Sequence, residues 1–152
     1  MSFRTIEEAI HYAISKENQS MNLYRMFQNI VTDIAAKKLL GDLADAEMEH
    51  KIMLEQALKD GTVDRVGGKE NAVTITLPNG TPEKAPTKDS TSQDIMNYAL
   101  QNEKNAYDLY HGLMEHYRGT SIEPLFDRLS EEEMKHRHIL EEQYESHFME
   151  WM

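Results

Sequence analysis

The stretches EMEH at residues 47–50 and EMKH at residues 133–136 decide the fold, because each places a glutamate and a histidine three positions apart. Residues three apart are neighbours on a helix surface, so both side chains of each pair face the same way. The second stretch follows the first by 86 residues (133 − 47 = 86), and this offset also carries Glu17 to Glu103 and Tyr24 to Tyr110. The chain is therefore predicted to contain two repeats of one helical unit.

Helical periodicity divides each repeat into two helices, and a connector rich in glycine and proline separates the repeats. Thr5 with Glu8, and Thr91 with Asp94, are expected to cap the first helix of each repeat, because a hydroxyl accepts an unpaired amide hydrogen and a carboxylate favours the positive end of a helix. In the connector, residues 73–77 predict an edge strand followed by a turn at 78–80. The predicted helices span residues 6–30, 34–60, 92–117 and 122–150.

Two helical hairpins joined by a long connector predict an all-α protein with the ferritin-like form of a four-helix bundle, in which a long crossover joins the second and third helices. A chain of this length is expected to bury about 70% of its unfolded surface, enough for one core. We expect a single domain over 1–152, with repeat one at 1–60, the crossover connector at 61–91 and repeat two at 92–152.

The composition argues against several classes of function. With 16 Lys and Arg against 27 Asp and Glu, the formal net charge is -11, so the surface repels a phosphate backbone and no nucleic-acid partner is expected. The longest uncharged stretch, 71–82, is too short to span a membrane, and the acidic N-terminal segment differs from a secretion signal, which favours a cytoplasmic location. The chain contains no cysteine, so a bound metal must use oxygen and nitrogen ligands.

Read in steps of three and four residues, the predicted buried face of every helix carries an ionisable group at its middle. Because an unpaired buried carboxylate costs several kcal/mol, four glutamates that meet in one bundle need a cation. Two divalent ions would balance four carboxylates and two neutral imidazoles, and these ligands suit both iron and manganese. In the predicted dinuclear site Glu47 and Glu133 bridge the metals, Glu17 and Glu103 are terminal ligands, and His50 and His136 each supply one nitrogen. The alternative is that the Glu–His pairs are structural, or a remnant that has lost its metal.

Two tyrosines are candidate catalytic residues. Tyr24 and Tyr110 each follow a predicted terminal glutamate by two helical turns on the same face, so their hydroxyls can hydrogen-bond ligand carboxylates and pass a proton. The alternative is that both are ordinary core tyrosines. Glu132 is a further candidate partner of the site, although its position also suits a solvated helix face.

The pattern Glu17, Glu47-x-x-His50, Glu103, Glu133-x-x-His136 resembles the ferritin-like superfamily, and within it the rubrerythrin group, over essentially the whole chain. The resemblance implies a carboxylate-bridged centre of two iron ions that reacts with hydrogen peroxide or dioxygen in defence against oxidative stress. It also implies a homodimer or a larger homo-oligomer. Typical members add a cysteine-ligated rubredoxin domain, so this cysteine-free chain is expected to need a separate electron donor protein.

A second departure from the rubrerythrin pattern concerns one ligand. Ala106 stands one turn after Glu103, where the family carries an extra glutamate, and Ser20 is its counterpart in the other repeat. Without that glutamate the ligand set is similar to that of bacterioferritins, and Met48 follows Glu47 at the place of their haem-ligating methionine. A ferroxidase is therefore the alternative function, although the end of the chain at Met152 argues against a storage cage. An oxidase of an organic substrate and a non-catalytic helical interaction module, indifferent to metal, are further alternatives.

Overall fold

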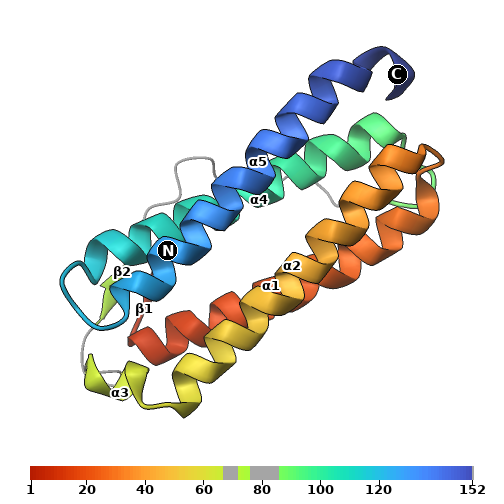
Figure 1. The fold of residues 1–152 in the computed structure, drawn as a ribbon. Helices are drawn as coiled ribbons and strands as arrows, with labels where there is room; N and C mark the ends of the chain where they lie inside the picture. The colour runs from red at the N-terminus through yellow and green to blue at the C-terminus, as the bar shows by residue number, and fades with distance from the viewer. Residues whose placement is uncertain (67–71, 76–85, 152) are drawn as a thin grey trace.

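The structure is a computed structural model that describes residues 1–66, 72–75 and 86–151, with side chains described through residue 145. Four long helices run the length of the molecule, and three short elements lie together at one end of it (Figure 1). In chain order the elements are β1 (Ser2–Phe3), α1 (Ile6–Ile30), α2 (Ile34–Lys59), α3 (Thr62–Arg65), β2 (Val73–Thr74), α4 (Ser92–His116) and α5 (Glu123–Trp151).

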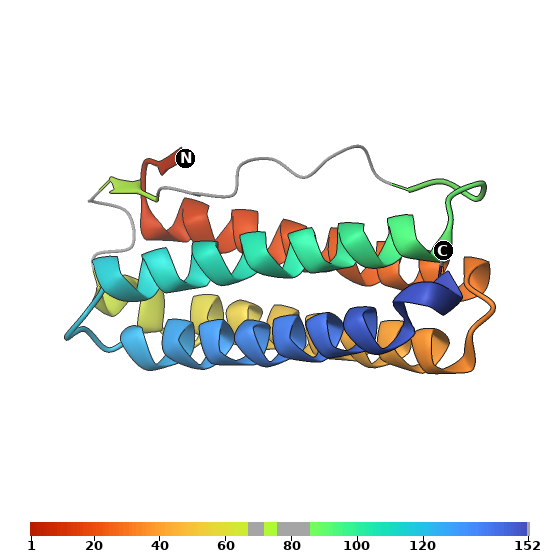
Figure 2. The same ribbon diagram turned by 90° about the horizontal axis from the view of Figure 1, so that it is seen from above.

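The long helices form two antiparallel hairpins, α1 with α2 and α4 with α5, which lie side by side in one bundle (Figure 2). The predicted helical bundle of two hairpins is therefore confirmed. α2 ends at the end of the bundle where α4 also ends, whereas α4 begins at the opposite end. The end of α2 and the start of α4 thus lie at opposite ends of the bundle. Residues 67–71 and 76–85 lie outside the described residues, so the path of the crossover stays a prediction.

The bounds of the four long helices agree with the sequence expectation to within one residue at each end. The two predicted capping pairs are also confirmed. Thr5 Oγ1 accepts a hydrogen bond of 3.1 Å from the amide of Glu8. At the start of α4, Thr91 Oγ1 accepts from the Asp94 amide at 3.1 Å, and the Thr91 amide donates to Asp94 Oδ2 at 3.1 Å. Both repeats therefore begin with the same local interaction.

The described part of the predicted connector strand pairs with a partner that the sequence did not indicate. Within the predicted strand at 73–77, β2 covers Val73–Thr74, and it pairs antiparallel with β1 at the N-terminus. The pairing continues to Ile75, whose amide donates to the Met1 carbonyl at 2.7 Å. Residues 76–77 and the predicted turn at 78–80 lie outside the described residues. The short helix α3, which begins after Gly61 at a φ of 85°, was not predicted.

Two apolar clusters fill the bundle, one at each end, and every long helix contributes to both. On α1, Ala13 belongs to the cluster beside the β-strands and Tyr24 to the other cluster, with Glu17 between them. On α2, Leu43 and Leu54 belong to different clusters, and residues 47–50 lie between them. The predicted buried faces are thus formed, and the ionisable groups occupy a polar layer between two apolar ones.

One glycine allows the connector to lie close to the bundle. A Cβ placed on Gly112 of α4 would lie 2.6 Å from Cγ2 of the buried Ile75. A Cβ on Gly41 of α2 would meet the Gln28 side chain at a similar distance, 2.5 Å, but the atom it meets is the far end of a flexible side chain.

We expect Gly112→Ala to lower the free energy of unfolding by about 1–3 kcal/mol, because Ile75 is held by backbone hydrogen bonds and cannot move without loss of packing. Gly41→Ala is the matched control, since alanine is favoured in helices by up to about 1 kcal/mol and the flexible Gln28 side chain can move aside at the cost of one hydrogen bond to the Lys37 carbonyl. Urea unfolding of both metal-free variants, followed by circular dichroism, measures the difference. Equal stability of the two variants would contradict the proposed contact.

Candidate metal centre

The polar layer is formed by six side chains, to which each long helix contributes one glutamate. All four glutamates are buried, and the most exposed of them is only 2% accessible. α2 and α5 each add a histidine three residues after the glutamate. The two side chains of each pair point the same way, because positions i and i+3 share a helix face. The six side chains are those of Glu17, Glu47, His50, Glu103, Glu133 and His136.

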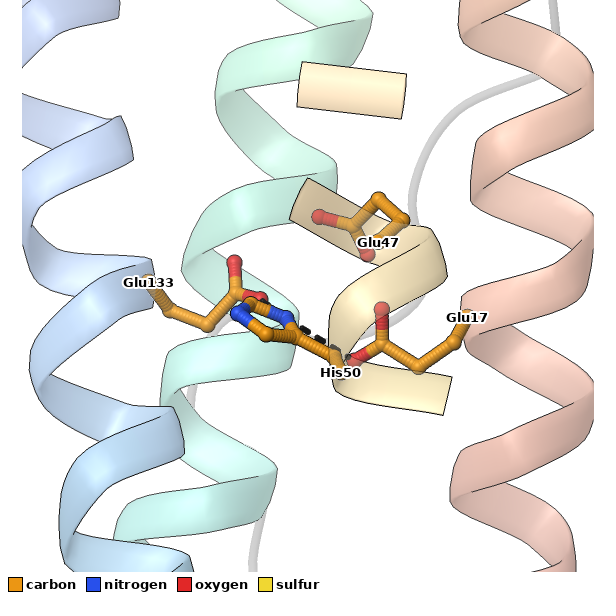
Figure 3. A group of neighbouring side chains, drawn as sticks. All are labelled: Glu17, Glu47, His50 and Glu133. Carbon is orange, nitrogen blue, oxygen red and sulfur yellow. Dashed lines mark ion pairs between the residues drawn. The ribbon is translucent and has the colours of Figure 1, made fainter. Parts of the chain in front are cut away.

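Their ligand atoms fall into two overlapping groups, and in each group these atoms lie within 4.8 Å of one another. One group joins Glu17 and His50, and the other joins Glu103 and His136. Glu47 and Glu133 belong to both groups, so each is placed between two adjacent positions. Figure 3 shows the first group, in which the side chains point toward one another from α1, α2 and α5.

Both histidines turn Nδ1 toward the carboxylates. His50 Nδ1 lies 3.0 Å from Glu133 Oε1 and 3.6 Å from Glu17 Oε1 (Figure 3). His136 Nδ1 lies 3.6 Å from Glu103 Oε2 and 3.9 Å from Glu133 Oε2. The imidazole rings stack with centroids 5.9 Å apart. The two halves of the centre are therefore built alike, as the repeats predict.

The chemistry of the donor atoms fits a pair of metal ions. Each of the six residues presents at least one buried nitrogen or oxygen atom that has no hydrogen-bond partner. Buried polar groups in native proteins are normally paired, so two groups of orphaned donor atoms fit the binding of cations. Carboxylate oxygen and imidazole nitrogen are ligands for first-row divalent metals, and one Glu from each of two helices with Glu-x-x-His from the other two is the ligand set of dinuclear carboxylate bundles.

Without metal, the carboxylates repel one another. Burial raises the pKa of Glu47 well above its usual range, and the charges of Glu133, Glu103 and Glu17 raise it further. Burial and the charge of Glu103 also raise the pKa of Glu133, to about 8. The pKa of Glu103 is lowered, because the contacts with Glu133 and His136 outweigh its burial. The metal-free centre therefore retains protons that a metal ion would displace.

The pKa values of both histidines are raised as well. Burial lowers the pKa of His50, but the carboxylates of Glu133 and Glu17 outweigh burial and raise this pKa to about 11. The same balance, with Glu103 and Glu133 as the neighbours, raises the pKa of His136 to about 10. Two imidazolium ions thus neutralise part of the buried negative charge when no metal is bound.

Each of the two tyrosines forms a hydrogen bond with a glutamate of the other repeat. Tyr24 donates a hydrogen bond of 2.9 Å to Glu103 Oε1, and Tyr110 donates one to Glu17 Oε1. Each tyrosine therefore bonds the glutamate of the other hairpin rather than the one that precedes it on its own helix. Burial raises the pKa of both hydroxyls well above the usual value, and the charge of the bonded glutamate adds to the effect.

Asn102 is a part of the centre that sequence reasoning missed. Its Nδ2 donates to Tyr24 Oη and to Ser20 Oγ, both at 2.9 Å. The 86-residue offset places Lys16 at the corresponding position of the first repeat, so this network exists on one side only. That departure from the repeat was the available signal. Glu132, a candidate partner, lies 3.5 Å from His50 Nε2.

The fold and the paired groups define a ferritin-like helical bundle with a buried cluster of carboxylates and histidines that fits a pair of metal ions. A family model described as Rubrerythrin matches residues 8–88 and 94–151, and the chain belongs to this family, as the ligand pattern predicted. A crystal structure from Thermotoga maritima, described as a ferritin-like diiron-carboxylate protein, matches with a TM-score of 0.75 and 19% identity over 91% of this chain and 93% of that chain. This likeness confirms the ferritin-like fold. A comparison with curated proteins gave no match.

In the part of the chain that the structure describes, none of the helices combines the length and the apolar composition needed to cross a membrane.

We expect the metal-free protein to lose stability as the pH rises from about 6 to 9. Between its usual pKa and its raised pKa, a group binds more protons in the folded than in the unfolded state, so raising the pH favours unfolding. This applies to Glu133 up to about 8 and to the two histidines up to about 10 and 11. The slope is of order 1 kcal/mol per pH unit, measured by urea unfolding of chelator-treated protein.

Glu47→Gln should reduce this slope, because it removes one of the mutually repelling carboxylates. Glu49→Gln is the matched control, since it removes the same charge from an exposed position two residues away. A metal-free protein whose stability increases over this pH range would contradict the buried, proton-retaining centre.

Proposed function

We propose that the six clustered residues bind two iron ions and that the loaded protein reduces hydrogen peroxide or dioxygen. The observation that carries the proposal is the pair of overlapping ligand groups that share Glu47 and Glu133. These two carboxylates would be shared by both metals, while Glu17 and Glu103 would each bind one of them as terminal ligands. His50 and His136 would each provide Nδ1 to one metal. The description of the similar Thermotoga maritima structure as a diiron-carboxylate protein favours iron over manganese.

When bound, two ferrous ions would supply two electrons and Lewis acidity to the oxidant. The reduction of one hydrogen peroxide molecule to two water molecules consumes two electrons and two protons. The electrons must be replaced after each cycle, and no cysteine in this chain can hold the iron of a rubredoxin-type donor. A separate electron donor protein therefore belongs to the proposal, as does the homo-oligomeric assembly that the family resemblance implies.

The chain itself holds the ligands and controls protons and water. The hydroxyls of Tyr24 and Tyr110 fix the orientation of the terminal glutamates, since each donates to one carboxylate oxygen. Their raised pKa values keep both hydroxyls protonated, so each can hold a proton at Oη beside a ligand carboxylate. The apolar clusters at either end of the polar layer exclude bulk water along the bundle axis.

A ferroxidase is the second candidate, and one observation favours it. Ala106 and Ser20 occupy the positions where a further glutamate ligand could stand, so the centre has four glutamates and two histidines. Ser20 instead accepts a hydrogen bond from Asn102. A ligand set of this kind suits oxidation of ferrous iron by dioxygen as well as peroxide reduction.

Metal stoichiometry is the first test of the proposal. We expect two iron ions per chain after anaerobic reconstitution with ferrous iron and desalting, measured by elemental analysis. Glu47→Ala combined with Glu133→Ala should abolish binding, because both ligand groups lose their shared carboxylates. The exposed pair Glu49→Ala and Glu131→Ala is the control and should retain both ions. A folded protein that binds no iron would contradict the proposal and favour a helical interaction module.

The oxidant is identified by rapid mixing of the ferrous protein with hydrogen peroxide and, separately, with dioxygen. The peroxidase proposal predicts that hydrogen peroxide oxidises the bound ferrous iron at least about tenfold faster than dioxygen does. Absorbance follows the oxidation, and the product is water. Faster oxidation by dioxygen, with accumulation of ferric mineral when excess ferrous iron is supplied, would instead establish the ferroxidase.

A further inference from the structure

The two repeats differ beside the histidines of the metal centre. Glu132 precedes His136 by four residues, and the residue that precedes His50 by four is Ala46. The repeat offset relates these two positions to each other, so a carboxylate in one repeat has a methyl group as its counterpart. The six predicted ligands are the same in both repeats, so the difference between Glu132 and Ala46 lies outside the ligand set.

Glu132 contacts the histidine of the opposite hairpin. Its Oε1 lies 3.5 Å from His50 Nε2, the ring nitrogen that faces away from the metal ligands. Its other oxygen accepts a hydrogen bond of 3.1 Å from Arg128 Nε, which holds the carboxylate in place. His50 is fully buried, and its Nε2 has no hydrogen-bond partner in the structure. The carboxylate is therefore placed to accept a hydrogen bond from the Nε2–H group of His50 when Nδ1 binds a metal.

His136 lacks a corresponding partner. Among the described residues, no carboxylate oxygen lies within 4.0 Å of its Nε2. The repeat offset relates Glu132 to Ala46, which has no carboxylate. The His136 side chain is 16% exposed, against 0% for His50. It also lines a surface pocket of about 430 Å³ with other α5 residues, among them Glu132, Lys135 and Ile139. His50 is thus enclosed with a carboxylate near its Nε2, and His136 is partly exposed to solvent.

We propose that Glu132 is a positioning residue that makes the two metal positions unequal. The inference rests on the proposed dinuclear site. A carboxylate that accepts the second N–H of a ligating histidine fixes its tautomer and ring orientation and raises its basicity, an effect of about 10- to 100-fold in metal affinity. The ion bound by His50 and Glu17 would have the higher affinity. The position at His136 and Glu103 is the exchangeable one, and its ion enters and leaves on the side of the pocket.

The test is a titration of the metal-free full chain with Mn²⁺, an ion that these ligands accept and that is stable in air. Calorimetry with chelator competition gives the two dissociation constants. In the unmodified protein we expect two ions that differ by at least about tenfold in affinity. Glu132→Gln should weaken the tighter ion by about 10- to 100-fold and leave the weaker one within about twofold.

Glu131→Gln is the matched control, because it removes the same charge from the neighbouring exposed residue of α5. It should leave both dissociation constants within about twofold. Ala46→Glu supplies the missing counterpart and should tighten the weaker ion. Since this added side chain could also disturb packing, the comparison of Glu132→Gln with Glu131→Gln decides the question.

Two equal dissociation constants in the unmodified protein would overturn the inference while supporting the dinuclear site. Equal effects of Glu132→Gln and Glu131→Gln would also overturn it, because the change would then reflect only net charge. Binding of fewer than two ions by the unmodified protein would overturn both the inference and the proposed function. The two failures are therefore distinguishable.

Discussion

The burial of four carboxylates in one layer of a helical bundle is the constraint on which the rest of the structure depends. A buried charge is costly unless it is paired, and here the nearest opposite charges are two imidazoles, of which His50 is fully buried and His136 is 16% exposed. The layer is tolerated because apolar clusters on both sides supply the folding free energy. The centre is thus a local loss of stability that a pair of cations can reverse, which couples metal binding to folding.

The same layer ties the two hairpins together. Tyr24 of the first hairpin bonds Glu103 of the second, and Tyr110 of the second bonds Glu17 of the first. Each shared carboxylate also faces ligands from both hairpins. A change in the angle between the hairpins would therefore alter both metal positions at once. The pairing of β1 with β2 adds a tie at one end of the bundle, between the N-terminus and the connector.

Much of this arrangement was predictable because it depends on local periodicity and on the repeat. Helix bounds, caps and the six clustered residues all follow from spacing along single helices. Three features depend on contacts between distant segments, which spacing does not reveal. These are the strand pairing of Ser2–Phe3, the exchange of the tyrosines between hairpins, and the bonds of Asn102. Spacing gave the helix face of Tyr24 and Tyr110, but the partner depended on how the hairpins pack.

A duplicated ligand set makes two metal positions alike, so any difference between them must come from residues where the repeats have diverged. Glu132 corresponds to Ala46 in the first repeat, and its carboxylate lies near His50. Asn102 corresponds to Lys16 in the first repeat. It donates a hydrogen bond to Tyr24, the tyrosine that in turn bonds Glu103. One metal position is thus reinforced at its histidine and the other at its terminal glutamate. A histidine partner governs how firmly an ion is held, whereas a hydrogen-bonded tyrosine and amide govern the protons at a carboxylate. In the proposed two-metal centre, the divergence would therefore separate the residue that acts on metal retention from the residues that act on protons.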